Sequence, residues 1–157
     1  MSAYSPVEHK PLAGYAVLTG TFNAAAAAYI AARRRSGAEI PERLPLRDFL
    51  LLAGGTQKLS RLISKDRVTS FVRSPFTRFS GEAGPSEVSE APRGRGLQLA
   101  IGELLVCPYC VGQWVAAAFV AGYAIDPKVT RMVAAVFAVL GASDALQQAW
   151  VAVDKRA

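Results

Sequence analysis

Three long blocks of uncharged, mainly apolar residues constrain the fold of this chain more than any other feature. Residues 12–32 form a block of 21 residues without a formal charge, and residues 104–125 form a second block of 22. Residues 129–153 are apolar apart from one arginine, one aspartate and two glutamines. A helix rises about 1.5 Å per residue, so each block can cross a hydrocarbon core about 30 Å thick. We therefore expect an all-α fold, a small integral membrane helical bundle with three transmembrane helices at these places.

Residues 46–66 predict a further helix whose depth is open. The segment has only seven consecutive apolar residues before Lys58 and Arg61 interrupt the pattern. A cation at the centre of a bilayer costs about 2.5–3.5 kcal/mol, so the two cations require a bundle interior, snorkelling or a shallow location. The segment is an amphipathic, re-entrant or fourth spanning helix.

The distribution of Lys and Arg favours a cytoplasmic C-terminus. If three blocks cross, fifteen cations lie on the side of the large loop and three on the other. If residues 46–66 also cross, the count outside that segment is eight against six. By the positive-inside rule both arrangements place residues 67–103 in the cytoplasm, and they disagree about the N-terminus.

The loop of residues 67–103 combines a basic start with a linker. Residues 79–96 are mainly Gly, Pro, Ser, Glu and Arg, a composition with too little apolar surface for a core, and they predict a flexible linker. Residues 57–78, which we call the basic segment, extend this basic start back into the preceding helix. The cations of the basic segment alternate with apolar residues and are candidates for binding anionic lipid headgroups or a protein partner. These cations are Lys58, Arg61, Lys65, Arg67, Arg73 and Arg78. Nucleic acid is not an expected partner because no recognition motif accompanies them.

Two cysteines form the most pointed motif, Cys107-Pro108-Tyr109-Cys110. A thiol at a helix start is a candidate for redox work because unsatisfied backbone N–H groups stabilise a thiolate. Two sulfurs supply half of a structural zinc shell, so a metal would need ligands from another subunit. Packing of two small apolar side chains is the third interpretation. No other cofactor is expected.

The last apolar block contains three polar residues at helical spacing, Asp144, Gln147 and Gln148. A buried acid requires a partner, and Lys58 or Arg61 is available from the second helix. We favour structural pairing over an ion or proton path, because a path normally needs more aligned polar groups.

Three stretches resemble a known family. They read KLSRLISKDRVT at residues 58–69, VRSPFT at 72–77 and GELLVCPYCVGQWV at 102–115. Together they resemble the bacterial membrane-protein family catalogued as domain of unknown function 1360, over most of residues 12–153. The resemblance implies a small multi-helix bacterial membrane protein, which we expect in the cytoplasmic (inner) membrane, and it supplies no activity.

No complete catalytic constellation is present, so the leading hypothesis is a non-enzymatic one. We expect a membrane scaffold or accessory subunit that binds lipids and either a protein partner or further copies of itself. The alternative is a thiol-redox or metal-binding membrane protein that uses Cys107 and Cys110, and a small transporter is less favoured.

Overall fold

The computed structural model describes residues 10–39 and 41–155. It contains six helices and two strands within those residues. In chain order they are α1 (Leu12–Arg35), α2 (Leu46–Lys65), α3 (Ser70–Arg73), β1 (Thr77–Gly84), β2 (Glu87–Pro92), α4 (Gly96–Val106), α5 (Pro108–Ile125) and α6 (Pro127–Asp154).

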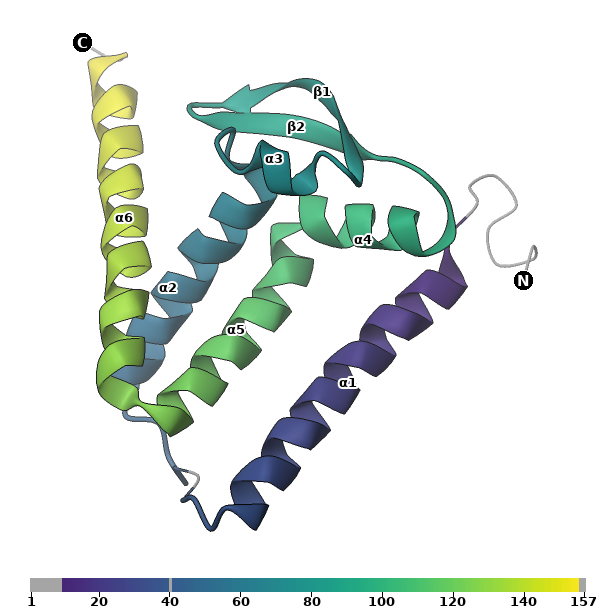
Figure 1. Cartoon of the computed structure of the whole chain (residues 1–157). Helices are drawn as coiled ribbons and strands as arrows, with labels where there is room; N and C mark the ends of the chain where they lie inside the picture. Colours follow the sequence, from purple (N-terminus) through teal and green to yellow (C-terminus); the bar gives the residue numbers. More distant parts are fainter. Residues whose placement is uncertain (1–9, 40, 156–157) are drawn as a thin grey trace.

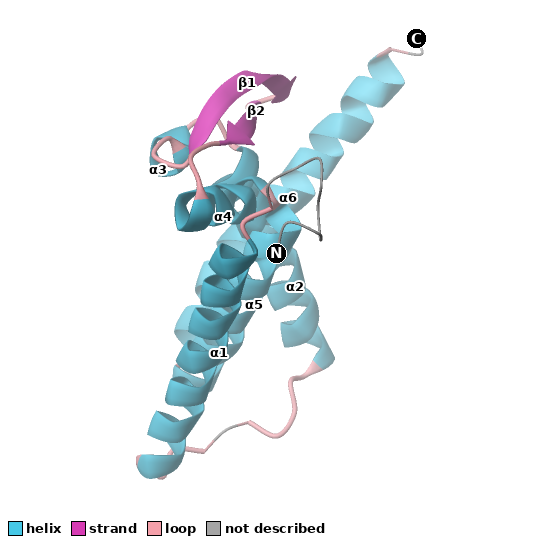
Figure 2. Ribbon diagram, turned by 90° about the vertical axis from the view of Figure 1, so that its right-hand side faces the viewer, coloured by secondary structure: helices cyan, strands magenta, loops and turns pink. Residues whose placement is uncertain are grey.

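Four long helices run alternately up and down, and the remaining elements gather at one end (Figure 1). Helices α2, α5 and α6 pack together, and α1 lies along the outer side of α5. The short helix α4 lies across the end of α5, with the hairpin of β1 and β2 above it (Figures 1 and 2). The start of α1, the hairpin and the end of α6 are therefore all at the same end of the molecule.

Two helices begin with the same local device, a capping side chain followed by proline. Cys107 caps α5, and Asp126 caps α6 by accepting hydrogen bonds from the backbone N–H groups of Lys128 and Val129 at 2.9 and 3.0 Å. Pro108 and Pro127 stand in the first turn, where no backbone N–H is needed. Each helix therefore follows its predecessor after a single residue.

The core lies where α2, α5 and α6 meet. Its buried apolar residues are Leu52, Val111, Val115, Phe119, Tyr123 and Ala134. Helices α2 and α6 lie close together at Gly55, where a Cβ atom would lie 3.0 Å from the carbonyl oxygen of Ala134. Any side chain at position 55 would therefore push the two helices apart.

Helix α1 is attached to the rest of the chain through long side chains. The rings of Phe22 and Trp114 meet edge to face with centroids 5.1 Å apart. Further along, the Tyr29 hydroxyl donates to the carbonyl oxygen of Ala121 at 2.8 Å. No residue of the most apolar window of α1 is buried within the described chain, so most of this helix surface is uncovered.

Three of the helices are long and apolar enough to cross a membrane, namely α1, α5 and α6. They correspond to the three predicted blocks, with one correction. The block at residues 104–125 is not one helix, because the chain bends at Cys107 and residues 104–106 belong to α4. The break follows from Pro108, since the residue before a proline avoids the helical conformation.

The prediction of an all-α chain is wrong for residues 77–92. These residues form an antiparallel hairpin in which Thr77 pairs with Pro92 and Glu82 with Val88. The proposed linker at 79–96 is thus largely an ordered element. Val88 is its buried anchor, and Ser86 makes the turn with φ at 63°. The sequence alone does not predict these strands, because most side chains of the hairpin are exposed and small.

Candidate functional site

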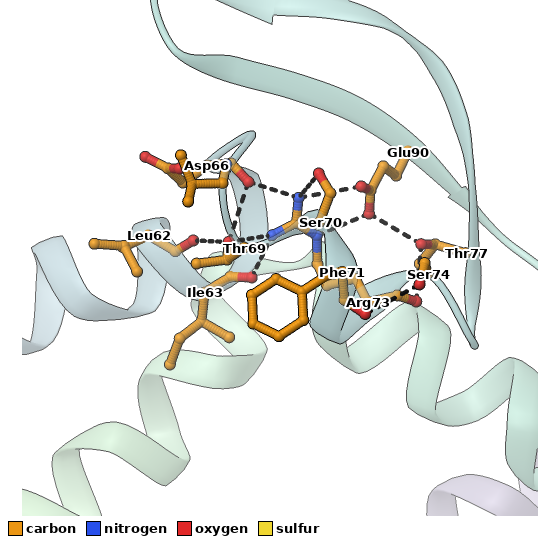
Figure 3. Close-up of polar contacts among 11 residues, drawn as sticks. Leu62, Ile63, Asp66, Thr69, Ser70, Phe71, Arg73, Ser74, Thr77 and Glu90 are labelled. Carbon is orange, nitrogen blue, oxygen red and sulfur yellow. Dashed lines mark hydrogen bonds and ion pairs between the residues drawn. The ribbon is translucent and has the colours of Figure 1, made fainter.

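The main polar site is the cap, which we define as residues 66–95 between the end of α2 and the start of α4. At its centre lies Arg73, whose side chain is completely buried (Figure 3). Its guanidinium donates to both carboxylate oxygens of Glu90, at 2.7 and 3.1 Å. The same group donates to the carbonyl oxygens of Ile63 at 2.6 Å and Asp66 at 2.9 Å, which close the last turn of α2. Arg73 therefore joins α2, α3 and β2.

The partner carboxylate of this arginine is held in its charged form. Burial alone would raise the pKa of Glu90, but hydrogen bonds from Arg73 and Thr77 and the charge of Arg73 outweigh burial and lower the pKa below its ordinary value of 4.5. The Thr77 hydroxyl lies 3.0 Å from the carboxylate. The folded cap thus contains Glu90 in its ionised form.

Two further glutamates of the hairpin also pair with arginines of the basic segment. Glu87 accepts two hydrogen bonds from the guanidinium of Arg61, at 2.5 and 2.8 Å. Glu82 forms an ion pair with Arg67. The basic segment and the supposed linker are therefore one charge-matched unit, with each of the three hairpin acids opposite a different arginine.

This pairing changes the interpretation of the six predicted lipid- or partner-binding cations. Arg73 is completely buried and bonded to Glu90, so its guanidinium is not presented at the surface of the described chain. Lys58 is directed into the bundle and ion-pairs with Asp144, while Arg61 and Arg67 are neutralised by glutamates. Within residues 10–39 and 41–155, Lys65 and Arg78 are the members of the set that form no ion pair.

The structure brings Asp144 together with Lys58, one of the two partners that the sequence suggested. The two glutamines are not part of this pair. Gln147 reaches only the hydroxyl of Ser143, at 3.5 Å, and Gln148 is exposed. The polar set of α6 is thus one ion pair with α2, beside two amides on the outside of the helix.

A second polar connection between α2 and α6 was not predicted. Asp48 is almost completely buried and accepts hydrogen bonds from Arg131 at 2.8 and 3.0 Å and from the Tyr123 hydroxyl at 2.5 Å. The signal available in the sequence was a lone acid near the start of one apolar segment and a lone cation near the start of another. Their separation of 83 residues concealed the pairing.

The two cysteines lie at the junction of α4 and α5. The Sγ atoms are 2.6 Å apart, and the backbone N–H of Cys110 donates to the Cys107 sulfur at 3.3 Å. Cys110 is exposed and Cys107 half-buried. This arrangement allows the pair to act together in thiol chemistry. Among the described residues, no three His, Cys, Asp or Glu side chains gather as a metal site within one chain would require.

An open groove of about 530 Å³ runs between α2 and α5 beside the cysteine motif. Phe49, Leu52 and Val120 line its apolar part, and Arg61 and Tyr109 lie at the end next to the cap. Arg61 already pairs with Glu87, so its charge is not available to a ligand at the polar end of the groove.

These features define a class: small, mainly helical proteins with three helices able to cross a membrane and a polar cap at one end. The chain belongs to the family described as Protein of unknown function (DUF1360), whose signature matches residues 51–150. The match begins within α2, so α1 lies outside it. The family match therefore covers a shorter part of the chain than residues 12–153, over which the resemblance was expected.

A relative supports the same assignment. The UPF0713 protein YngL of Bacillus subtilis (strain 168) is 28% identical over 111 residues, which cover 69% of this chain and 82% of that protein. No solved structure matches the chain.

Proposed function

We propose that the chain is a non-enzymatic scaffold or accessory subunit of the bacterial cytoplasmic membrane, which binds lipids and a protein partner through its helices and its cap. One observation carries this proposal. The charged side chains that could perform chemistry are largely paired with one another, whereas the apolar surfaces of α1 and α6 are uncovered. In a membrane, such uncovered apolar helix surfaces contact lipid and are available for packing against other helices.

The proposed topology has four crossings with the cap in the cytoplasm. Helix α2 lies lengthwise against α5 and α6, so it crosses wherever they cross. Its Lys58 and Asp48 have partners inside the bundle, which removes the main objection to burying them. The positive-inside rule, with eight cations against six, places the cap end in the cytoplasm. The N-terminus is then also cytoplasmic.

The topology is tested by labelling single cysteines with a membrane-impermeant reagent, after replacing Cys107 and Cys110 by serine. We expect Ser86→Cys in the hairpin to react only in inside-out vesicles, and Ser36→Cys after α1 only in right-side-out vesicles. Reaction of both positions from the same face would contradict four crossings.

The cap is also proposed to rest on the lipid surface. Phe71 and Val68 are about three-quarters exposed or more, and the Phe71 ring points away from the hairpin towards the end of the bundle (Figure 3). Lys65 and Arg78 supply cations close by for anionic headgroups. Phe71→Trp, in a background with Trp114 and Trp150 replaced by phenylalanine, should be quenched by brominated acyl chains. The same quenching for a tryptophan at Ser86, at the hairpin turn, would remove the argument for an oriented cap.

The scaffold proposal itself is tested by photo-crosslinking in intact membranes. A photoreactive residue at Val17, on the uncovered surface of α1, should capture one defined polypeptide, identified by mass spectrometry and retained after mild detergent extraction. The matched control is Ser36, an exposed residue in the loop after α1, where we expect no capture. If photo-crosslinking gives only lipid adducts at every exposed helix position, the scaffold proposal is contradicted.

A second candidate function is thiol–disulfide exchange, and the direct contact between the two sulfurs favours it. The Cys107 thiolate would attack a substrate disulfide and form a mixed disulfide, which the Cys110 thiolate then resolves. The protein dithiol becomes a disulfide as the substrate disulfide becomes two thiols, with two electrons transferred. Reversible loss of two titratable thiols with an oxidised glutathione buffer would support it. Identical thiol reactivity in the wild type and in Cys107→Ser would count against it.

A further inference from the structure

The outer face of α6 carries a continuous heptad pattern. Met132, Val136, Val139, Leu146, Trp150 and Val153 follow one another at alternating steps of four and three residues, with Ser143 in the remaining position. We call these seven residues the α6 seam. Its six large apolar side chains are between 60% and 75% exposed. A repeat of this kind, averaging 3.5 residues, is the pattern with which one helix packs lengthwise against another.

The opposite face of α6 is already used within the chain, and it is built differently. Ala134, Ala138 and Gly141 lie against α2, where small residues allow the close approach at Gly55. Two charged residues of α6, Arg131 near its start and Asp144 past its middle, also turn to α2. Helix α6 thus has a small-residue face for its own chain and a large-residue, uncharged seam for something outside it.

The acyl chains of the lipid do not reach the full length of the seam. Helix α6 has 28 residues and so extends about 42 Å, whereas a hydrocarbon core of about 30 Å takes about 20 residues. Counted from Met132, the first residue after Lys128 and Arg131, the core ends near Val151. Trp150 then lies at the edge of the core, and Val153 lies in the headgroup region, outside the acyl chains. Figure 2 shows this end of α6 standing away from the cap, with no other element beside it.

We propose that the α6 seam packs in parallel against the α6 seam of a second copy of this chain. The inference deepens the proposed function, on which it rests for the membrane orientation. Copies inserted with one topology present their α6 helices in the same direction, and two-fold pairing brings each seam residue to its own counterpart. The occupant must be an uncharged helix of the same period, and α6 itself fits that description.

The residues beside the seam agree with a two-fold pair. One flank contains Ala135, Ala142 and Ala149, which let the two backbones approach. The charged residues on the flanks stand at opposite ends, Lys128 at the start and Asp154 at the end. In a parallel pair each of these residues faces an uncharged side chain of the other copy, so no like charges meet. Ser143 meets its counterpart at the middle of the seam, where two hydroxyls can hydrogen-bond.

The test is disulfide crosslinking of the full chain in native membranes, with Cys107 and Cys110 replaced by serine. Leu146→Cys and Val153→Cys place a thiol on the seam. The controls are Ala145→Cys and Ala152→Cys, which are also exposed but lie off the seam. With a mild oxidant we expect a species of twice the chain mass from the two seam variants and none from the two controls.

A second measurement covers the case of a variant that folds poorly. Photobleaching of single labelled chains in lipid nanodiscs should show two steps for the wild type and one step for the double variant L146A/W150A. Equal crosslinking at all four positions, a folded wild type with one step, or a seam disulfide to a different polypeptide would each overturn the proposal. If the wild type bleaches in one step while a photoreactive residue at Val17 still captures a partner, the pairing alone is overturned and the scaffold function stands.

Discussion

Two arginine–carboxylate pairs hold this molecule together at opposite ends, and they differ in how completely they are enclosed. In the cap, Arg73 and Glu90 have side chains that are 0% and 6% exposed. At the other end of the bundle, Asp48 is just as buried, but its partner Arg131 is 34% exposed. The first pair is sealed inside a cluster of backbone and hydroxyl acceptors, whereas the second keeps one member at the surface.

The difference shows what each pair can tolerate. Removing either member of a sealed pair leaves an uncompensated charge without access to water. An arginine that is partly exposed can turn its head group towards solvent or lipid headgroups when its partner changes. We therefore expect the cap to depend on its pair more strongly than the α2–α6 contact does.

The largest effect is expected for Arg73→Ala. The change leaves Glu90 buried and unpaired and also removes the donors to the last turn of α2, so we expect the cap to lose about 3–5 kcal/mol of stability. Limited proteolysis within residues 77–92 measures this loss. Arg78→Ala is the matched control, because Arg78 is exposed and makes no ion pair in the part of the chain that the structure describes. Equal protection of the two variants would contradict the structural role of Arg73.

A smaller effect is expected for Asp48→Asn. The amide keeps the size of the side chain and one acceptor, and Arg131 can move outward, so the thermal midpoint in detergent should fall by less than in Arg73→Ala. Circular dichroism of the purified chain records it. A midpoint lower than that of Arg73→Ala would reverse the ranking of the two pairs.

Acid should loosen the cap through Glu90. The folded pKa of Glu90 lies below 4.5, so its contribution to stability is complete above pH 4.5 and is lost as the pH falls through the lowered pKa. Pepsin cleavage of the hairpin should therefore accelerate only below pH 4.5. Glu90→Gln supplies the comparison, since its cleavage rate, corrected for the activity of the protease, should lack this dependence.

The smallest effect is expected for Glu82→Gln. Glu82 and Arg67 are 62% and 59% exposed, and such surface pairs contribute about 0.2–1 kcal/mol. The proteolysis assay should barely separate this variant from the wild type, and added salt should remove any difference. A loss of stability as large as that of Arg73→Ala would mean that the exposed Arg67–Glu82 pair, rather than the buried Arg73–Glu90 pair, holds the hairpin.

The long helices were predictable because their signal is local. Twenty uncharged residues report a helix of membrane length without reference to the rest of the chain, and the structure has helices at all three blocks. The break at Cys107 was not predicted, since the apolar composition continues through it and only Pro108 marks the bend.

The cap was not predictable by the same means, because its stability comes from pairs between segments. Read alone, the hairpin sequence has the composition of a linker, and the segment before it has that of a lipid-binding surface. Glu90 pairs with Arg73, which lies 17 residues earlier in the chain, and Glu87 pairs with Arg61, which lies 26 residues earlier. Such matching is invisible in either segment by itself. The Lys58–Asp144 pair was anticipated because a buried acid required some cation, whereas Asp48 looked like an ordinary residue of a helix start.

The order of synthesis gives the α2–α6 contact one more consequence. Asp48 and Lys58 leave the ribosome long before Arg131 and Asp144, which follow 83 and 86 residues later. Until α6 is made, α2 has an acid and a base without their final partners, and it is too polar to settle in the bilayer by hydrophobicity alone. In the proposed four-crossing topology, we expect the stable insertion of α2 to wait for the last helix, so that a nascent chain stopped before α6 leaves α2 at the membrane surface.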